Sequence, residues 1–247
     1  MKRFLLAFAT LMVLAAGTSV MAGNEKVTER RDVTGFERIL LQGSPKIKYT
    51  QGSQFRVEVR APQSLVKNVI TRVEGKRLIV SLKNTKWVFR LGQSDDDVVV
   101  YVTSPDLTGV ELQGSGDFEC KNHLDTDNLD VVLKGSGDIE FSDVICDKLK
   151  TSVVGSGDLE IGKVVALQSD IELVGSGDVK VKQQQVKQTQ VELKGSGDIK
   201  LNLQKCGIVN CRLLGSGDIT LQGDVLKLNS TRRGSGDINT NGLTIKK

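Results

Sequence analysis

The tetrapeptide Gly114-Ser115-Gly116-Asp117 decides the fold, because the chain repeats it six more times. The seven copies, written GSGD below, begin at Gly114, Gly135, Gly155, Gly175, Gly195, Gly215 and Gly234. Successive copies are therefore 21, 20, 20, 20, 20 and 19 residues apart. A period near twenty residues is typical of a solenoid, in which each repeat buries its apolar face only by stacking on its neighbours.

The residues on both sides of each GSGD also repeat. In the copy at Gly175, Ile171 and Leu173 precede the corner and Val179 and Val181 follow it, with mostly polar residues between them. Such a period-two pattern indicates a strand with one buried face. Each repeat is thus predicted to be a strand, a GSGD corner, a second strand and a looser return segment. Stacked at the spacing of paired strands, about 4.8 Å, the repeats form an all-β fold, a parallel β-helix.

Glycine and aspartate suit a sharp corner between two strands. Glycine reaches positive φ without a Cβ clash, and Ser or Asp side chains can bond backbone N–H groups of the turn. Seven aspartates in register also repel, by about 3–4 kcal/mol per neighbouring pair at an effective dielectric constant of about 20. Hydrogen bonds, or a ladder of bound cations, would have to offset that repulsion. We favour the structural interpretation, because the calcium-binding β-roll repeat is much denser in aspartate.

Residues 1–22 have the pattern of a secretory signal peptide. Two basic residues precede an apolar run from Phe4 to about Ala16, and the residues before Ala22 fit a cleavage site after Ala22. The run is too short for a spanning helix, and no later segment is longer, so we predict an exported chain without a transmembrane segment. Cleavage would lower the formal net charge from +4 to +2. A nearly neutral chain gives no reason to expect a nucleic-acid partner.

The rest of the chain, residues 23–247, is predicted to be a single elongated β-helix domain. Residues 110–247 hold the seven regular repeats, and residues 23–109 hold irregular N-terminal coils. Within the latter, Gly43-Ser44 follows Leu-Gln as Gly114-Ser115 does, which indicates a degenerate eighth corner with Lys46 in place of Asp. Strands are expected at Phe55–Arg60, Arg77–Leu82 and Asp97–Thr103, with a short helical turn within Leu65–Val73.

Four cysteines in an exported chain suggest disulfides. The repeat argues against them, because Cys120, Cys146 and Cys206 fall in the first, second and fifth repeats. At one strand spacing per repeat, Cys206 would be about 14 Å or more from the other two. Cys120 and Cys211 also occupy inward positions of the strands. We therefore expect four buried free thiols.

The last repeat departs from the pattern. Ser230 and Arg232 stand where other repeats have apolar inward residues, as expected of a terminal repeat that blunts an open edge. Leu243-Thr244-Ile245 forms a final strand whose edge could pair with another protomer. The sequence therefore predicts a possible homo-oligomer through the edges of the β-helix.

Candidate reactive groups are few. His123 lies in the return segment of the first repeat without a Ser or Cys nucleophile motif beside it, so we interpret it as a solvated loop residue. Trp87 and Phe89 lie near Asp95-Asp96-Asp97, which could form a sugar or calcium site. We favour loop aromatics beside a solvated charge run. No Walker loop, dinucleotide fingerprint, zinc spacing or nucleophile elbow occurs in the sequence.

One outward column of charges is a further candidate. The residues two after each GSGD aspartate are Glu119, Glu140, Glu160, Lys180, Lys200, Thr220 and Asn239. Like charges on adjacent strands destabilise a sheet unless their neighbours compensate. The acidic part could bind a divalent cation, but we favour a solvated face whose side chains splay apart. We therefore assign no catalytic, cofactor-binding or metal-binding residue.

With the GSGD ladder, the signal peptide and the entry Asp32-Val33-Thr34-Gly35-Phe36, the chain resembles the auto-transporter adhesin head domain family (the GIN domain) of exported bacterial proteins. The resemblance covers nearly all of the chain after residue 22. It implies a right-handed β-helix, no recognised catalytic residues and a role in cell adhesion.

Together these observations predict a non-enzymatic exported structural or binding module, acting in cell adhesion or envelope interactions. Its expected location is the periplasm, the outer membrane or the cell surface. Its expected partner is a cell-surface or envelope macromolecule of unknown identity. The alternative is a carbohydrate-active protein, either a polysaccharide binder or a lyase, for which only the Trp87 region offers support.

Overall fold

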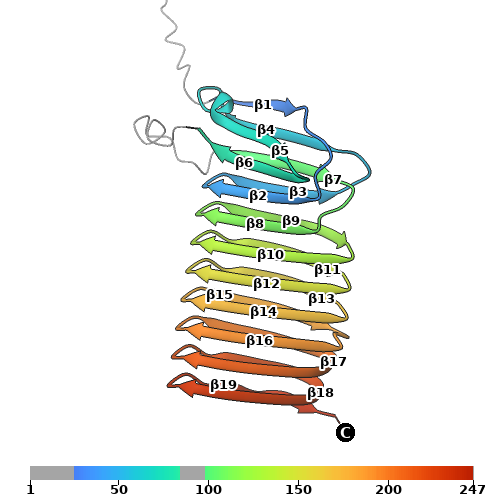
Figure 1. The fold of residues 1–247 in the computed structure, drawn as a ribbon, viewed down its shortest axis with the longest axis vertical. Helices are drawn as coiled ribbons and strands as arrows, with labels where there is room; N and C mark the ends of the chain where they lie inside the picture. The colour runs from blue at the N-terminus through green and yellow to red at the C-terminus, as the bar shows by residue number, and fades with distance from the viewer. Residues whose placement is uncertain (1–24, 84–97, 247) are drawn as a thin grey trace, which may run out of the picture.

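The computed structural model describes residues 25–83 and 98–246, which form a stack of strand-built coils (Figure 1). The predicted signal peptide, residues 1–22, lies outside the described residues. So do Trp87, Phe89 and Asp95–Asp97, so the candidate sugar or calcium site stays a prediction.

Each regular coil contributes one strand to each of two walls that meet at the GSGD corner. We call the wall that runs into the corner the approach wall and the wall that leaves it the exit wall. The approach wall holds β2 (Arg38–Gly43), β8 (Gly109–Gly114), β10 (Asn128–Gly135), β12 (Lys148–Gly155), β14 (Gln168–Gly175), β16 (Gln188–Gly195) and the second halves of β17 (Asp198–Gly215) and β18 (Ile219–Gly234). The exit wall holds β3 (Lys46–Gln51), β9 (Asp117–Asp125), β11 (Ile139–Ile145), β13 (Leu159–Val165), β15 (Asp178–Gln184), the first halves of β17 and β18, and β19 (Ile238–Ile245).

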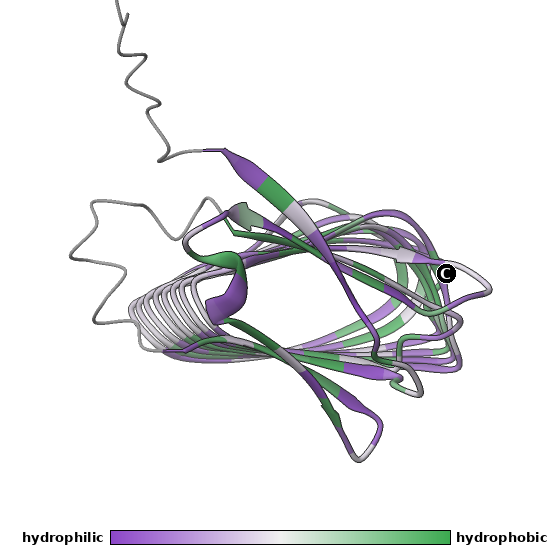
Figure 2. Cartoon of the chain, turned by 90° about the horizontal axis from the view of Figure 1, so that it is seen from above, coloured by the Kyte–Doolittle hydropathy of each residue, from purple (hydrophilic) through white to green (hydrophobic). Residues whose placement is uncertain are grey.

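Neighbouring strands of each wall pair in parallel. On the approach wall the register aligns every corner glycine with the next, from Gly43 beside Gly114 to Gly215 beside Gly234. Seen along the axis, the corners form one pale column at the edge of the stack (Figure 2). The structure thus confirms the predicted parallel β-helix.

The interior is filled by the side chains that the alternating pattern placed there. Leu133, Val153, Leu173 and Leu193 follow one another in register and are at most 1% exposed. The buried apolar residues form one cluster that runs from Phe36 to Val225. Within this core, three aromatic rings of the exit wall follow one another. The Tyr49 and Phe118 rings are stacked with their centroids 6.2 Å apart, and the Phe118 and Phe141 rings are tilted with their centroids 5.3 Å apart.

The corner requires glycine for two separate reasons. Gly175 has φ +136°, where a residue with a side chain would be strained. Gly177 has no such φ, yet a Cβ on it would overlap the backbone oxygen of Gly157 in the preceding coil. The second reason lies in the stacking distance between coils, so the φ argument from the sequence explains only the first glycine.

The hydrogen bonds of the corner also run between coils. The Gly114 oxygen accepts bonds from the N–H groups of Ser136 (2.9 Å) and Gly137 (3.2 Å). The carboxylate of Asp158 accepts from the N–H of Asp178 in the next coil at 2.8 Å. The same arrangement recurs at three other pairs: Asp138 with Asp158, Asp198 with Asp218, and Asp218 with Asp237. The prediction that these carboxylates close their own turns was therefore wrong, because the backbone N–H groups that they bind lie one coil further on.

The return segment is also more regular than predicted. Strand pairing continues along it, for example between Val144 and Val164, and β17 and β18 run through it without a break. Bulges accompany it, between Phe141 and Asp143 and between Leu203 and Cys206. Buried apolar side chains on the return segment, such as Val186, explain why it pairs and packs like the walls.

The N-terminal layer is where the structure departs most from the prediction. Its elements are β1 (Lys26–Arg31), β4 (Arg56–Pro62), the 3₁₀ turn η1 (Val66–Asn68), β5 (Val69–Glu74), β6 (Arg77–Leu82) and β7 (Val99–Ser104). Three pairings here are antiparallel, β1 with β4, β4 with β7 and β5 with β6, whereas β6 and β7 pair in parallel with β2 and β3. The chain leaves the stack after β3, folds back on itself and returns at β8.

As a result the coils do not stack in chain order. The coil of β2 and β3 lies between β6 and β7 on one side and β8 and β9 on the other. Its Gly43-Ser44 corner is the predicted eighth corner, since the Gly43 oxygen accepts from the N–H of Ser115 (3.1 Å) and of Gly116 (2.9 Å). The predicted helical turn corresponds to η1.

The two ends of the stack are closed differently. At the N-terminal end Leu65 and Val66, beside η1, are at most 1% exposed and belong to the core cluster. At the other end Ser230 and Arg232 are exposed. Arg232 donates to the Gly236 oxygen at 3.1 Å and pairs with Asp237. This polar terminal coil has the atypical character that the sequence predicted.

All four cysteines are buried and free, as predicted. Cys120 and Cys211 lie in the walls, and Cys146 and Cys206 lie on the return segment. Burial raises the pKa of the thiols of Cys120 and Cys146 to about 11 and that of Cys211 to about 12. These thiols are thus held protonated and unreactive.

Candidate functional site

The GSGD aspartates of successive corners form a column, and the interactions of this column are mainly structural. Burial raises the pKa of Asp138, and the charges of Asp117 and Asp158 add to the effect. At one end of the column the degenerate corner supplies a cation, because the Lys46 ammonium lies 3.6 Å from the carboxylate of Asp117. In the described parts of the chain, no three His, Cys, Asp or Glu side chains are grouped so that they could hold a metal ion.

The charged column on the exit wall is compensated by its neighbours. Glu119 pairs with Lys46, and although partial burial opposes its ionisation, this bond and the surrounding lysines lower the pKa of Glu119. The Glu140 carboxylate lies 3.7 Å from the Lys121 ammonium, and Glu160 lies in register with Lys180. The glutamates are therefore surrounded by ammonium groups, which suits a solvated surface.

His123 lies at the end of the exit wall, on its outer side. Its Nδ1 is 3.0 Å from a carboxylate oxygen of Asp143, whose other oxygen is 3.3 Å from the Lys163 ammonium. These three side chains come from three successive coils and form a surface ion cluster. The partner of His123 is thus a carboxylate that Lys163 also contacts.

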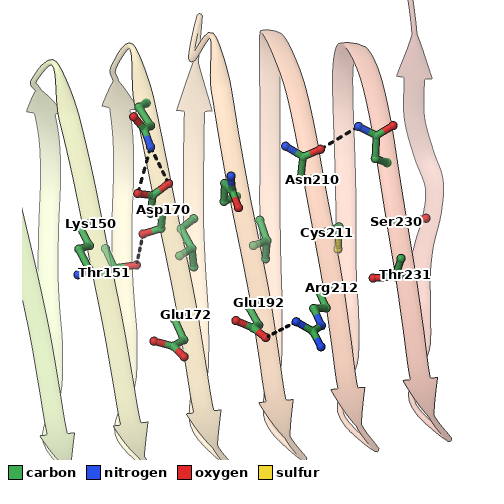
Figure 3. A pocket seen from close by; sticks show the side chains of 15 residues that line it. Lys150, Thr151, Asp170, Glu172, Glu192, Asn210, Cys211, Arg212, Ser230 and Thr231 are labelled. Carbon is green, nitrogen blue, oxygen red and sulfur yellow. Dashed lines mark hydrogen bonds and ion pairs between the residues drawn. The ribbon is translucent and has the colours of Figure 1, made fainter.

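A groove of about 700 Å³ lies on the outer face of the approach wall (Figure 3). It crosses β12, β14, β16, β17 and β18, so its long direction follows the axis of the stack. Two rows of side chains border it. The distal row, five residues before each corner glycine, is Lys150, Asp170, Gln190, Asn210 and Asn229. The proximal row, three residues before, is Glu172, Glu192, Arg212 and Thr231.

The rows are straight because the strands are in perfect register. Asp170 pairs with Gln190 and Gln190 with Asn210 in the parallel ladder, and Glu172, Glu192 and Arg212 follow one another in the same way. The floor consists of the intervening residues Thr151, Ile171, Val191, Cys211 and Ser230. Backbone groups of the floor are engaged in the strand ladders, so the side chains of the two rows are what the groove offers to a ligand.

The carboxylates of the groove are compensated within the protein, whereas Lys150 has no ion pair among the described residues. The Glu172 and Glu192 carboxylates lie 2.9 and 3.2 Å from the ammonium of Lys194. Glu192 also lies 3.5 Å from the guanidinium of Arg212. Asp170 lies 3.7 Å from the ammonium of Lys148. Each carboxylate of the groove therefore already has a cation beside it.

The amides of the distal row keep hydrogen-bonding capacity. Asn229 donates to the Asn210 oxygen at 2.8 Å (Figure 3), which leaves both N–H groups of Asn210 and the oxygen of Asn229 unused by this bond. Within the described residues the Gln190 side chain makes no hydrogen bond. Three successive coils thus present amide donors and acceptors in one line.

The groove supports binding better than catalysis. Its cysteine, Cys211, is 4% exposed and burial raises the pKa of its thiol to about 12, so it cannot serve as a thiolate nucleophile near neutral pH. The remaining polar lining groups are amides, hydroxyls, paired charges and the Lys150 ammonium. Such groups orient a ligand through hydrogen bonds.

The groove is not among the sites predicted from the sequence, which concern the outward residues after each aspartate rather than those before each glycine. The signal was present in the sequence, since the fifth residue before the corner glycine is polar in each of the four repeats from Asp170 to Asn229. Only the register shows that these residues face one continuous hollow.

Comparison with known proteins finds one matching family. The family described as "Putative auto-transporter adhesin, head GIN domain" matches residues 35–206 and 164–247. No curated protein matches the sequence. No helix among the described residues is long and apolar enough to cross a membrane.

Solved structures share the fold. A "putative adhesin" from Bacteroides fragilis NCTC 9343 superposes with a TM-score of 0.76 at 24% identity, over 87% of this chain and 96% of that one. A "putative adhesin" from Parabacteroides distasonis ATCC 8503 gives 0.70 at 20% identity, over 87% and 97%. A "putative lipid binding protein" from the same organism gives 0.66 at 21% identity, over 87% and 98%. At these identities the similarity concerns the fold alone.

Proposed function

The chain belongs to the auto-transporter adhesin head GIN domain family, and from this premise we propose that it is an exported, non-enzymatic binding module for a surface or envelope macromolecule. The observation that carries the proposal is the groove of about 700 Å³ that crosses five strands of the approach wall. A site of this length suits a polymer better than a small metabolite, because side chains from successive coils repeat the same kind of contact along the axis.

The rigid scaffold supports this role. The strands β12, β14, β16 and β17 beneath the groove are held by parallel pairing on both sides, and their inner faces are packed in one core cluster. A ligand would therefore meet a surface that is already in place, which reduces the ordering cost of binding. Adhesion and envelope attachment both call for such a preformed surface.

The test measures binding of the purified chain from Gly23 to Lys247, fluorescently labelled, to bacterial envelopes and to epithelial cells. We expect saturable binding that Asn210→Ala weakens. The matched control is Asn202→Ala, an equally half-buried asparagine of the same strand, β17, on the exit wall. Thermal unfolding must show that both variants remain folded.

Two results would contradict the proposal. One is the absence of saturable binding to any envelope or cell preparation. The other is turnover of a small substrate or polysaccharide by the same protein. Phospholipid vesicles belong in the panel because one structural relative is described as lipid-binding, and binding to vesicles alone would redirect the function to lipids.

A further inference from the structure

We propose that the approach-wall groove binds a neutral, unbranched polysaccharide laid along the axis of the β-helix. The inference rests on the proposed function and names the chemical class of its ligand. Its basis is the arrangement of charges, amides and backbone groups in the groove, taken in turn below.

The compensated charges argue for a neutral ligand. Glu172 and Glu192 share the ammonium of Lys194, and Glu192 also contacts Arg212. A polyanion would have to draw these cations away from their carboxylates. A polycation would have to compete with the same lysine and arginine. Both exchanges lose one ion pair for each one gained, so neither charged polymer has a net electrostatic advantage at these residues. Lys150, at the β12 end of the groove, is the one lining charge without an ion pair among the described residues.

The amides argue for hydroxyl groups. Gln190, Asn210 and Asn229 present donors and acceptors together on three successive coils. A hydroxyl both donates and accepts, so it can satisfy either end of an amide. Polysaccharides carry several hydroxyls on every unit. Repeated amide–hydroxyl contacts would give modest affinity per unit and add up along the chain.

The spacing distinguishes a polysaccharide from a polypeptide. The rows repeat once per coil, about 4.8 Å, whereas same-side residues of an extended polypeptide repeat about every 6.6–6.8 Å. A polypeptide would therefore drift out of register within two coils. One hexopyranose unit extends about as far as one coil step, so each unit can meet an equivalent pair of side chains.

Strand addition, the usual way of binding an extended peptide, is excluded over the central strands of this groove. It needs free backbone N–H and C=O groups at a sheet edge. The strands β14 and β16 under the groove are paired on both sides by neighbouring coils. Only the second half of β18, at one end of the groove, has a strand partner on one side alone among the described residues. Over the central strands a ligand meets side chains, which again favours one recognised through hydroxyl groups.

The experiment measures binding of the purified chain to neutral glucan, mannan and galactan fragments of graded length. Charged counterparts are polygalacturonate and chitosan, and a neutral glycine–serine polypeptide completes the panel. We expect at least one neutral polysaccharide to bind, with little change on adding salt, since salt screens only charged contacts. Affinity should rise with length up to about four or five units, because five strands span about 19 Å.

Variants locate the site. Asn210→Ala should weaken binding about five- to tenfold, the range expected for the loss of one or two hydrogen bonds. Asn202→Ala on the exit wall should leave it unchanged. Equal melting temperatures of the two variants would exclude a folding defect as the cause.

Other outcomes overturn the inference. Tighter binding of polygalacturonate or chitosan, or of the polypeptide, would assign the groove to another class of ligand. Failure of every polysaccharide, while Asn210→Ala still weakens attachment to envelopes, would refute the polysaccharide and leave the proposed function standing. Failure of both assays would refute both.

Discussion

The corner side and the return side of the stack solve the same problem by different means. Both bring the chain repeatedly from one wall to the other, yet the corner repeats one tetrapeptide and the return segment varies freely. At the corner, backbone meets backbone between coils, and no side chain fits between Gly177 and Gly157. On the return side, apolar side chains such as Val186 and Cys206 fill the space instead.

Length changes follow the same division. The first repeat has one residue more than the next, and the pairing of β9 with β11 shifts between Phe141 and Asp143. The last repeat has one residue fewer than the one before, and the pairing of β17 with β18 shifts between Leu203 and Cys206. The corner glycines stay aligned throughout. Side-chain packing can absorb an extra residue, whereas direct backbone contact cannot.

The largest expected difference in stability is between two variants that each carry one inserted glycine, one at the corner and one on the return side of the same repeat. Inserted after Ser176, it should abolish cooperative folding of the neighbouring coils, because it breaks the backbone contacts of the corner. Inserted after Gln184, it should cost no more than about 2 kcal/mol, as for ordinary local changes. Chemical unfolding followed by circular dichroism measures both. Equal effects would refute the division between the two sides.

A single methyl group tests the corner more finely. Gly177→Ala places a Cβ against the Gly157 oxygen, so the coils must separate, and the free energy of unfolding should fall by more than about 4 kcal/mol. Ser176→Ala, at the exposed neighbouring position, is the control and should change it by less than about 0.5 kcal/mol. A small decrease in the free energy of unfolding of Gly177→Ala would show instead that neighbouring coils can move apart without destabilising the fold.

Substitutions of side chains near the corner should have the next largest effects on the free energy of unfolding. Leu173→Ala removes a fully buried leucine between Val153 and Leu193 and should cost about 2–5 kcal/mol. Asp158→Ala should cost about 1 kcal/mol, since it removes the acceptor of the Asp178 N–H but also relieves carboxylate repulsion.

Asp178→Ala should cost less than Asp158→Ala. The N–H of Asp198 in the next coil bonds to the Gly177 oxygen, at 3.3 Å, rather than to the Asp178 carboxylate. Denaturant titration of the three variants gives the order directly. If either aspartate variant proved worse than Leu173→Ala, hydrogen bonds rather than the apolar core would dominate the corner's stability.

The smallest expected effect near neutral pH is the reactivity of the cysteine thiols. None should react with a disulfide reagent in the native protein at pH 8, and Cys146 on the return side, 6% exposed, should be the first to react on mild destabilisation. Earlier labelling of Cys120, which lies in a wall and is fully buried, would contradict this order. Mass spectrometry after timed alkylation identifies the site.

Alkaline pH should lower the free energy of unfolding through the same thiols. Burial raises their pKa from 9.0 to about 11 for Cys120 and about 12 for Cys211, so above pH 9 the unfolded chain loses protons that the folded chain keeps. Stability is therefore complete below pH 9 and falls as pH rises toward 11, by at most about 1.4 kcal/mol per thiol and pH unit. Cys211→Ala should reduce that slope.

The sequence by itself determined the β-helix, its inward side chains and its free thiols. These follow from a repeat period and a period-two pattern that are local properties of the chain, so Leu173 and Cys211 could be placed inside without coordinates. Gly43-Ser44 was recognisable as a corner for the same reason.

Contacts between coils were decided only by the tertiary structure. The need for Gly177, the bond from Asp178 to Asp158 and the position of the β2–β3 coil between β7 and β9 all depend on how closely separate coils approach. The groove belongs to the same class, because Asp170, Gln190 and Asn210 become one row only when the register sets them side by side. Distances between residues twenty apart are a property of the stack, and no local pattern in the sequence encodes them.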